Sequence, residues 1–588
     1  MIKTFLTKTT AFLLCLTLLY GLTGCGLLPK FPGFPEPNPT TPSEPETTAP
    51  SESTFPVNQD PSVSVPHFDV PLEERSRNSF DSAAYDSAYQ EFAALLESDG
   101  NAERIGELYE IINDLLQDSK TDAALALYDY DQDVSNGELA ERYSSMQSSY
   151  SSVYGKSVQL FRSVFSTAYA DTLRMQIGDV LADKFEAAAT VTEEENALKA
   201  RIRELERTYD TLARQGADSL AFKELYIELV NANNAYARLR GHENYASYAY
   251  SKGKGRDYTI EDIRGIESEV VTGFIPVYRA YVRMVTKDVV YDAYKENHDS
   301  GEVKFSKLKG CIENISPKLV ESLEHLIRNR LYDVDFSDTK GQSDYTVALP
   351  SYHDAYIFIN PQNKVSDYKT ILHEFGHYNA LYYRAGDAFD PNLVMDVEEI
   401  MSQGLQLLCY DYYDAYNEEY GRALAQSTVF QIMRSVPKGF AVNEAEYLCY
   451  TAPDLTLEKL DDIWSAANEK YAQPLGKTED AWTAIPHVFQ QPFYYIGYAT
   501  SSLAAFELFV KSREDFRQSV EQYLAIAQLP AGTGFLTALR SAGLDNIFEK
   551  GRITALSEEL ADILLPEQSF SSPQPLCSAC QKSPKGLF

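Results

Sequence analysis

The segment His373-Glu-Phe-Gly-His377 constrains the fold and chemistry of this chain more than any other. It is an H-E-x-x-H motif in a sequence with only 8 histidines. Residues four apart lie on the same face of an α-helix, so a helix here would aim both imidazoles at one point. Two such imidazoles can hold one zinc ion, and the glutamate beside the first can reach a water on that ion. The motif therefore predicts a helix and the chemistry of metal-assisted amide hydrolysis.

A third metal ligand is expected, because catalytic zinc has three protein ligands and an open fourth position. Glu399 lies 22 residues after His377 (399 minus 377), which leaves room for a loop and a returning helix. Glu399, Gln403 and Gln406 have the spacing i, i+4, i+7 and would share one face of that helix. Glu399 is the predicted third ligand. Glu398, about 100° away around the helix, is the alternative.

Two short runs with strand composition interrupt the mainly helical pattern just before the motif. They are residues 345–349 and 355–359, rich in Tyr, Val, Ile and Phe. A helix follows at once, with Ser366 as its predicted N-cap. A short sheet is therefore expected beside the zinc helix, and an extended peptide could add to its edge. His353 lies just before the second run, where a substrate-facing role and a structural role are both open.

A cluster of rings lies towards the C-terminal end, at His487, Tyr494, Tyr495 and Tyr498. Amide hydrolysis builds negative charge on the carbonyl oxygen, and phenol or imidazole donors can stabilise that charge. Aromatic clusters are also typical of a hydrophobic core. The pattern alone leaves both interpretations open.

These segments together resemble the thimet oligopeptidase and oligoendopeptidase F family of zinc metallopeptidases. Members carry H-E-F-G-H or H-E-L-G-H and then a glutamate that opens an E-x-x-S motif, here Glu399-Ile-Met-Ser402. A histidine and a tyrosine-rich stretch follow, similar to His487 and Tyr494-Tyr-Ile-Gly-Tyr498. The later Gly532-Thr-Gly-Phe and Ala542-Gly-Leu-Asp545 resemble the family's glycine-containing loop and closing helix. The likeness covers about residues 340–550.

The resemblance implies one Zn²⁺ ion with three ligands, namely His373, His377 and Glu399. It implies Glu374 as the general base that later passes its proton to the leaving amine. It also implies that His487 and Tyr498 contact the substrate and stabilise the oxyanion. Tyr494 or Tyr495 would assist in substrate binding. Gln406 stands where many members of the family have glutamate. This difference puts in question a hydrogen bond from this position to one of the zinc-binding residues.

The family fold implies a mainly α-helical body with a small β-sheet next to the zinc helix. It further implies a deep, narrow substrate channel with zinc at its floor. Such a channel admits short unstructured peptides and excludes folded proteins.

The N-terminus has the pattern of an export signal. Positive residues Lys3 and Lys8 are followed by an apolar run at 11–19, too short for a typical spanning helix. The next residues, Leu22-Thr-Gly-Cys25, resemble the lipobox of bacterial lipoproteins. This resemblance implies lipidation of Cys25 and anchoring on the bacterial cell membrane, facing outside the cytoplasm.

The predicted organisation has five parts. They are a lipoprotein signal peptide (1–24), a Pro/Ser/Thr-rich tether (25–66), an N-terminal helical region (67–255), a zinc metallopeptidase catalytic region (256–565) and a polar tail (566–588). The tail contains Cys577 and Cys580 in a C-x-x-C pattern. Without a second such pair, this pattern is only a weak indication of a zinc site. The scattered cysteines are predicted to be core residues, namely Cys311, Cys409 and Cys449.

The formal net charge of −34 argues against nucleic acid as a partner, since no basic field opposes phosphates. The leading functional hypothesis is a zinc-dependent endopeptidase that cleaves short unstructured oligopeptides at the cell surface. The alternative is a lipid-anchored peptide-binding protein without turnover. Glu374 favours the first, because a binding protein has no need of a base at that position.

Overall fold

A computed structural model describes residues 67–97, 102–186, 192–285, 291–384, 394–478 and 480–566. The predicted signal peptide, Cys25, the tether, Cys577 and Cys580 lie outside these residues. Within the described part, no helix has both the length and the apolar composition needed to cross a membrane.

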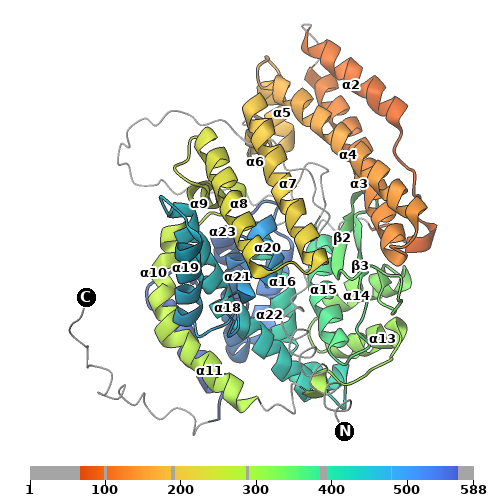
Figure 1. The fold of residues 1–588 in the computed structure, drawn as a ribbon. Coiled ribbons are helices and arrows are strands. Elements are labelled where there is room, and N and C mark those ends of the chain that lie inside the picture. Colours follow the sequence, from red (N-terminus) through yellow and green to blue (C-terminus); the bar gives the residue numbers. More distant parts are fainter. Residues whose placement is uncertain are drawn as a thin grey trace.

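The described chain is mainly helical, as predicted (Figure 1). The first helices are α2 (Ser82–Leu96), α3 (Ala102–Gln132), α4 (Gly137–Val164), α5 (Ala170–Ile177), α6 (Asp179–Glu186), α7 (Glu193–Gln215), α8 (Ser219–Leu239) and α9 (Tyr245–Tyr248). The middle of the chain forms α10 (Ile260–Glu269), α11 (Ile275–Met284), α13 (Gly301–Ile312), α14 (Pro317–Arg328), α15 (Asp367–Tyr382) and α16 (Met395–Leu408). The last are α17 (Tyr413–Tyr416), α18 (Gly421–Thr451), α19 (Leu457–Lys470), α20 (Pro486–Gln490), α21 (Ile496–Glu514), α22 (Phe516–Ala527), α23 (Phe535–Ala542) and α24 (Arg552–Leu564).

The sequence itself divides the long helical segment between residues 193 and 239. Gly216 ends α7 in the left-handed conformation, with φ of 63°, which costs glycine little. Asp218 then begins α8, because its carboxylate accepts a hydrogen bond from the backbone N–H of Ala221 at 3.1 Å. The result is a pair of packed helices, α7 and α8, in place of one long rod.

A three-stranded sheet precedes α15. Its strands are β1 (Tyr332–Asp333), β2 (Tyr345–Leu349) and β3 (Asp354–Phe358), in the order β1-β3-β2. β2 and β3 are antiparallel, and β1 runs parallel to β3. The two predicted strands are therefore present, whereas β1 is too short to leave a pattern in the sequence. The sheet lies between α3 and α15, with β2 at its edge (Figure 1).

The described residues pack around one large hydrophobic core and a smaller one. The smaller core joins α2–α6 through buried rings such as Phe92, Phe161 and Phe185. Helices α7 and α8 contribute to the larger core, which also contains both strands of the β2–β3 pair and α15–α24. The predicted core cysteines are buried and carry free thiols, namely Cys311, Cys409 and Cys449.

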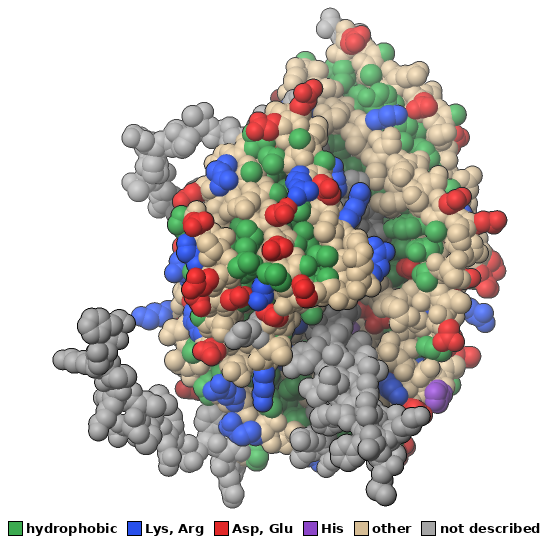
Figure 2. All heavy atoms as spheres, in the orientation of Figure 1, with side chains coloured by type: hydrophobic (Ala, Val, Ile, Leu, Met, Phe, Trp, Pro, Cys, Tyr) green, Lys and Arg blue, Asp and Glu red, His purple; other side chains and the backbone are tan. Residues whose placement is uncertain are grey.

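The charge on the visible face is dispersed. Figure 2 shows Asp and Glu side chains scattered among Lys and Arg side chains, with no single acidic patch over this face. This distribution fits the solubilising role of surface charge.

Candidate metal centre and active site

The H-E-x-x-H motif lies on α15, as predicted. His373 and His377 are one turn apart, with ring centroids separated by 4.9 Å. Ser366 occupies the predicted N-cap position, although its side chain makes no capping hydrogen bond. The carboxylate of Asp367 instead accepts hydrogen bonds from two backbone N–H groups of the preceding loop.

Gly376 permits the close crossing that brings the third predicted ligand to the histidines. A Cβ atom at Gly376 would lie 2.5 Å from the Cα of Ser402 and 2.6 Å from the carbonyl oxygen of Met401, both on α16. Only a residue without a side chain fits such an approach. The motif's fourth position is therefore glycine because the two backbones touch there.

Glu399 lies on α16 opposite the two histidines. Its Oε2 is 3.6 Å from His373 Nε2, and its Oε1 is 3.9 Å from His377 Nε2. One possible ligand atom from each of the three residues lies within 4.8 Å of the others. The structure thus brings together the three residues predicted to hold zinc, and Glu399, not Glu398, is the acidic member.

Ser402 orients this carboxylate. Its hydroxyl donates a hydrogen bond to Glu399 Oε2 at 3.0 Å, which gives the E-x-x-S spacing a physical reason. Glu399 and Ser402 are both buried, so little water competes for the carboxylate.

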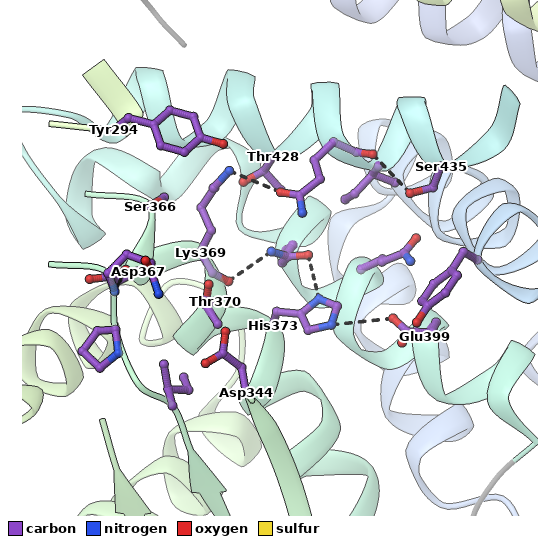
Figure 3. A pocket seen from close by; sticks show the side chains of 18 of the residues that line it. Tyr294, Asp344, Ser366, Asp367, Lys369, Thr370, His373, Glu399, Thr428 and Ser435 are labelled. Atoms are coloured by element: carbon purple, nitrogen blue, oxygen red, sulfur yellow. Dashed lines mark hydrogen bonds and ion pairs between the residues drawn. The ribbon is translucent and has the colours of Figure 1, made fainter. Parts of the chain in front are cut away.

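Gln406 orients His373. Its side-chain Oε1 accepts a hydrogen bond from His373 Nδ1 at 3.3 Å, and its Nε2 donates to the carbonyl oxygen of Lys369 at 3.2 Å (Figure 3). With Nδ1 acting as a donor, Nε2 keeps its lone pair directed towards Glu399. The glutamine therefore retains the hydrogen bond that the sequence comparison had put in question.

Glu374 lies beside the cluster and is almost fully buried, with 1% exposure. Its Oε2 accepts a hydrogen bond from Thr346 Oγ1 on β2 at 2.8 Å, whereas its Oε1 has no hydrogen-bond partner among the described residues. Burial raises the pKa of this carboxyl well above its usual range, and Asp344 and Glu399 raise it further. A buried carboxylate oxygen with an open lone pair suits a proton acceptor.

Burial lowers the pKa of His377 to about 4, so its imidazole is neutral near pH 7. A neutral imidazole is the form that ligates a metal. Two imidazoles, one carboxylate and the adjacent open oxygen of Glu374 together fit a divalent cation of the zinc type.

A second cluster of possible ligands lies elsewhere, at His67, His325 and Asp354. Asp354 Oδ2 already accepts a charged hydrogen bond from buried Arg75 at 2.7 Å and lies 2.9 Å from His325 Nε2. A metal ion there would lie against the guanidinium charge. This cluster instead joins the N-terminal segment to β3.

The predicted rings form one aromatic unit at the start of α21. His487 stacks on Tyr494, with centroids 5.1 Å apart, and meets the edges of Tyr495 and Tyr498 at 5.7 and 6.0 Å. Tyr498 lines the same cavity as His373 and Glu399. Burial lowers the pKa of His487 to about 4, which leaves a neutral ring.

A buried network that the sequence did not reveal ties this aromatic unit to α16. Arg256 donates to Asp396, one turn before Glu399, at 2.8 Å and to the backbone carbonyl of Phe493 at 2.9 Å. Glu446 accepts from the N–H of Phe493 at 3.0 Å, and Phe493 has a φ of 61°. These contacts hold the loop before Tyr494 in a conformation that a bulky residue rarely adopts. Arg256 and Asp396 are 140 residues apart, so no local pattern could link them.

His353 is not among the residues that line this cavity. Its ring stacks on Phe68 with centroids 6.2 Å apart, and its carbonyl oxygen accepts a hydrogen bond from His67 Nδ1 at 2.7 Å. Of the two roles that the sequence left open, these contacts are those of a structural residue.

Residues 313–527 match the model of the family described as Peptidase family M3. They form a Peptidase family M3 domain. The M3 domain contains the metal cluster, Glu374 and the aromatic unit, and it confirms the predicted family resemblance.

The chain is 24% identical over 343 residues to oligopeptidase PepF of Bacillus subtilis (strain 168), covering 54% of this chain and 50% of that protein. It is 21% identical over 355 residues to the oligoendopeptidase F homolog of Lactococcus lactis subsp. lactis (strain IL1403), covering 54% and 55%. The chain thus spans about half the length of the curated relatives it matches.

Solved structures share the fold over a longer stretch. A structure of PZ peptidase A with an inhibitor has a TM-score of 0.69 at 19% identity, over 84% of this chain and 99% of that one. A structure assigned to oligoendopeptidase F, from Bacillus anthracis strain Ames, has a TM-score of 0.67 at 17% identity, over 85% and 98%. These likenesses confirm the predicted helical fold class.

Proposed function

We propose that this protein is a zinc-dependent endopeptidase that hydrolyses short unstructured oligopeptides. The observation that carries the proposal is the convergence of His373, His377 and Glu399 beside the open oxygen of Glu374, within an M3 domain. The names of the relatives, oligopeptidase PepF and oligoendopeptidase F, support peptides as the substrate class.

Zinc held by His373, His377 and Glu399 would polarise the scissile carbonyl and lower the pKa of a water. Glu374 would accept a proton from the attacking water at Oε1, which has no hydrogen-bond partner in the described part of the chain. Its raised pKa suits a carboxyl that holds this proton and then delivers it to the leaving amine.

The aromatic unit would stabilise the charge that develops on the carbonyl oxygen. Tyr498 lines the cavity beside Glu399, and the neutral ring of His487 carries an N–H that can donate. Such donors lower the barrier because they are already in place when the charge forms.

Strand β2 would align the substrate. It is one of the two edge strands of the sheet, so its outer backbone groups can pair with an extended peptide. Thr346 on this strand donates to Glu374, which couples the peptide's position to that of the base. A peptide must be unfolded to pair in this way, which favours short flexible substrates.

The location is proposed from the sequence. The lipobox-like Leu22-Thr-Gly-Cys25 supports lipid attachment at Cys25, and the tether at 25–66 would hold the enzyme at the outer face of a bacterial membrane.

The test is to incubate the zinc-loaded full-length protein with unstructured peptides of increasing length and with a folded protein, with and without a chelator. Mass spectrometry of the products should reveal internal cuts in the short peptides that the chelator abolishes. Peptides that are retained but never cut would favour the alternative, a peptide-binding protein without turnover.

A further inference from the structure

The cavity at the metal cluster continues away from it along α15. Besides His373 and Glu399, its lining includes Thr370 and Lys369, one turn before His373 on α15 (Figure 3). Gln431 on α18 also lines it. Its lining combines the polar side chains of Thr370, Thr428 and Gln431 with apolar ones such as Ile432, so polar groups are available to a ligand there.

Lys369 is the cation of this extension. Its side chain is 8% exposed, and its Nζ donates to Gln431 Oε1 at 3.3 Å. Figure 3 shows the Lys369 side chain extending towards Tyr294. Among the described residues, no carboxylate forms an ion pair with it.

The other buried cationic side chains of the described chain are all paired with carboxylates. This holds for Lys223, Lys304, Lys340, Arg75, Arg240 and Arg256. Each of these cations thus has a carboxylate partner, whereas Lys369 has none within the part of the chain that the structure describes. An unpaired buried charge is costly, and an anionic ligand beside Lys369 would lower that cost.

Besides Glu399 of the ligand cluster, Asp344 and Asp367 line the same cavity, and neither forms an ion pair with Lys369. Asp367 accepts hydrogen bonds from the backbone N–H groups of Gln362 and Lys364 and pairs with Lys304 at 3.6 Å. Burial raises the pKa of Asp344 to about 7, and burial alone lowers the pKa of Lys369 to about 8. The described residues therefore supply no carboxylate partner for this ammonium.

We infer that Lys369 is a specificity-determining residue that binds a carboxylate of the peptide substrate. This inference rests on the proposed peptidase function and names its substrate class: peptides with an anionic group close to the scissile bond. Lys369 and His373 are one turn apart, a rise of about 6 Å. Since an extended residue spans about 3.3 Å, the carboxylate lies on the order of two residues from the bond cut. This carboxylate is either the C-terminal carboxylate of the peptide or the side chain of an Asp or Glu residue in it.

The experiment compares kcat/KM for two pairs of peptides on the zinc-loaded full-length protein. One pair differs in a C-terminal carboxylate or carboxamide, and the other in Glu or Gln near the cleaved bond. Wild type should prefer the carboxylate member of one pair by about 10-fold or more, as for a hydrogen bond to a charged group. The pair that responds identifies the source of the carboxylate.

The variant Lys369→Met should lose this preference and still cleave the neutral peptide. Lys318→Met, which removes an exposed lysine on α14, is the matched control and should keep the preference. Equal rates within both pairs for wild type, or an unchanged preference in Lys369→Met, would overturn the inference.

A binding measurement separates this inference from the proposed function. Calorimetry with Glu374→Gln should detect tighter binding of the carboxylate peptide, and Glu374→Gln combined with Lys369→Met should abolish the difference. If wild type cleaves no peptide, the proposed function fails while the binding comparison still tests Lys369. If cleavage occurs without any role for Lys369 in binding, the inference alone fails.

Discussion

Gly376 and Ser402 mark a direct contact between two helix backbones, since a Cβ on Gly376 would lie 2.5 Å from the Cα of Ser402. The same Ser402 donates a hydrogen bond to Glu399. Ser402 therefore takes part both in the crossing of α15 and α16 and in the orientation of Glu399, the predicted acidic ligand.

Gly376→Ala should push the two helices apart and weaken metal binding. Overpacking of this kind costs about 1–3 kcal/mol of folding free energy. Denaturant unfolding and metal analysis would measure both effects. Gly265→Ala on α10 is the control, because nothing lies within 4 Å of the added Cβ and alanine favours a helix. Normal metal binding by Gly376→Ala would refute the proposed role of the crossing.

Glu374→Gln should retain the metal and lose turnover by about 10²–10⁴-fold, because it removes a base and no ligand. Metal content and peptide cleavage are measured on the same sample. Glu398→Gln is the comparison, since its carboxylate is not part of the metal cluster, and it should remain active. Loss of metal in Glu374→Gln would contradict the separation of base from ligands.

Gln406→Leu should weaken metal affinity by about 10–100-fold, the usual effect of removing the partner of a ligating histidine. The leucine cannot accept the hydrogen bond from His373 Nδ1. Gln406→Glu preserves an acceptor at this position and should bind metal at least as well as wild type. A competition assay with a chromophoric chelator reports both affinities, and equal values for Gln406→Leu and wild type would argue against this hydrogen bond.

Because the His487 ring is buried, its protonation should lower the free energy of unfolding at acid pH. Burial lowers its pKa from 6.5 to about 4, so the unfolded chain takes up this proton at a higher pH than the folded one. Folding stability attributable to His487 is thus present above pH 6.5 and is lost as the pH falls towards 4. The loss is at most about 1.4 kcal/mol per pH unit for a single group.

Urea unfolding of wild type and His487→Gln at a series of pH values measures this effect. The free energy of unfolding should fall less steeply with acid in the variant. Parallel curves between pH 6.5 and 4 would show that the ring is solvated and titrates normally.

The parts of the site that the sequence predicted are those with local spacing. His373 and His377 are four residues apart on one helix, and Glu399 follows His377 by 22 residues (399 minus 377), a spacing that allows a returning helix. The strands at 345–349 and 355–359 were recognisable from composition.

The parts that were missed depend on contacts between distant residues. Thr346 meets Glu374 across the sheet edge, and Arg256 reaches Asp396 over 140 residues. Neither contact leaves a periodic pattern, because each is set by how separate elements pack. Lys369 is a further case, since only the folded cavity reveals that this buried lysine forms no ion pair with any described carboxylate.

The central claim is that one zinc ion on His373, His377 and Glu399 is required for peptide cleavage. The most direct measurement is to strip the protein of metal and titrate Zn²⁺ back while following the cleavage of a short peptide. We expect no cleavage without metal and a linear recovery that ends at one equivalent per chain, with no recovery in Glu399→Ala at that zinc concentration. Cleavage by the metal-free protein, or full recovery in Glu399→Ala, would contradict the account.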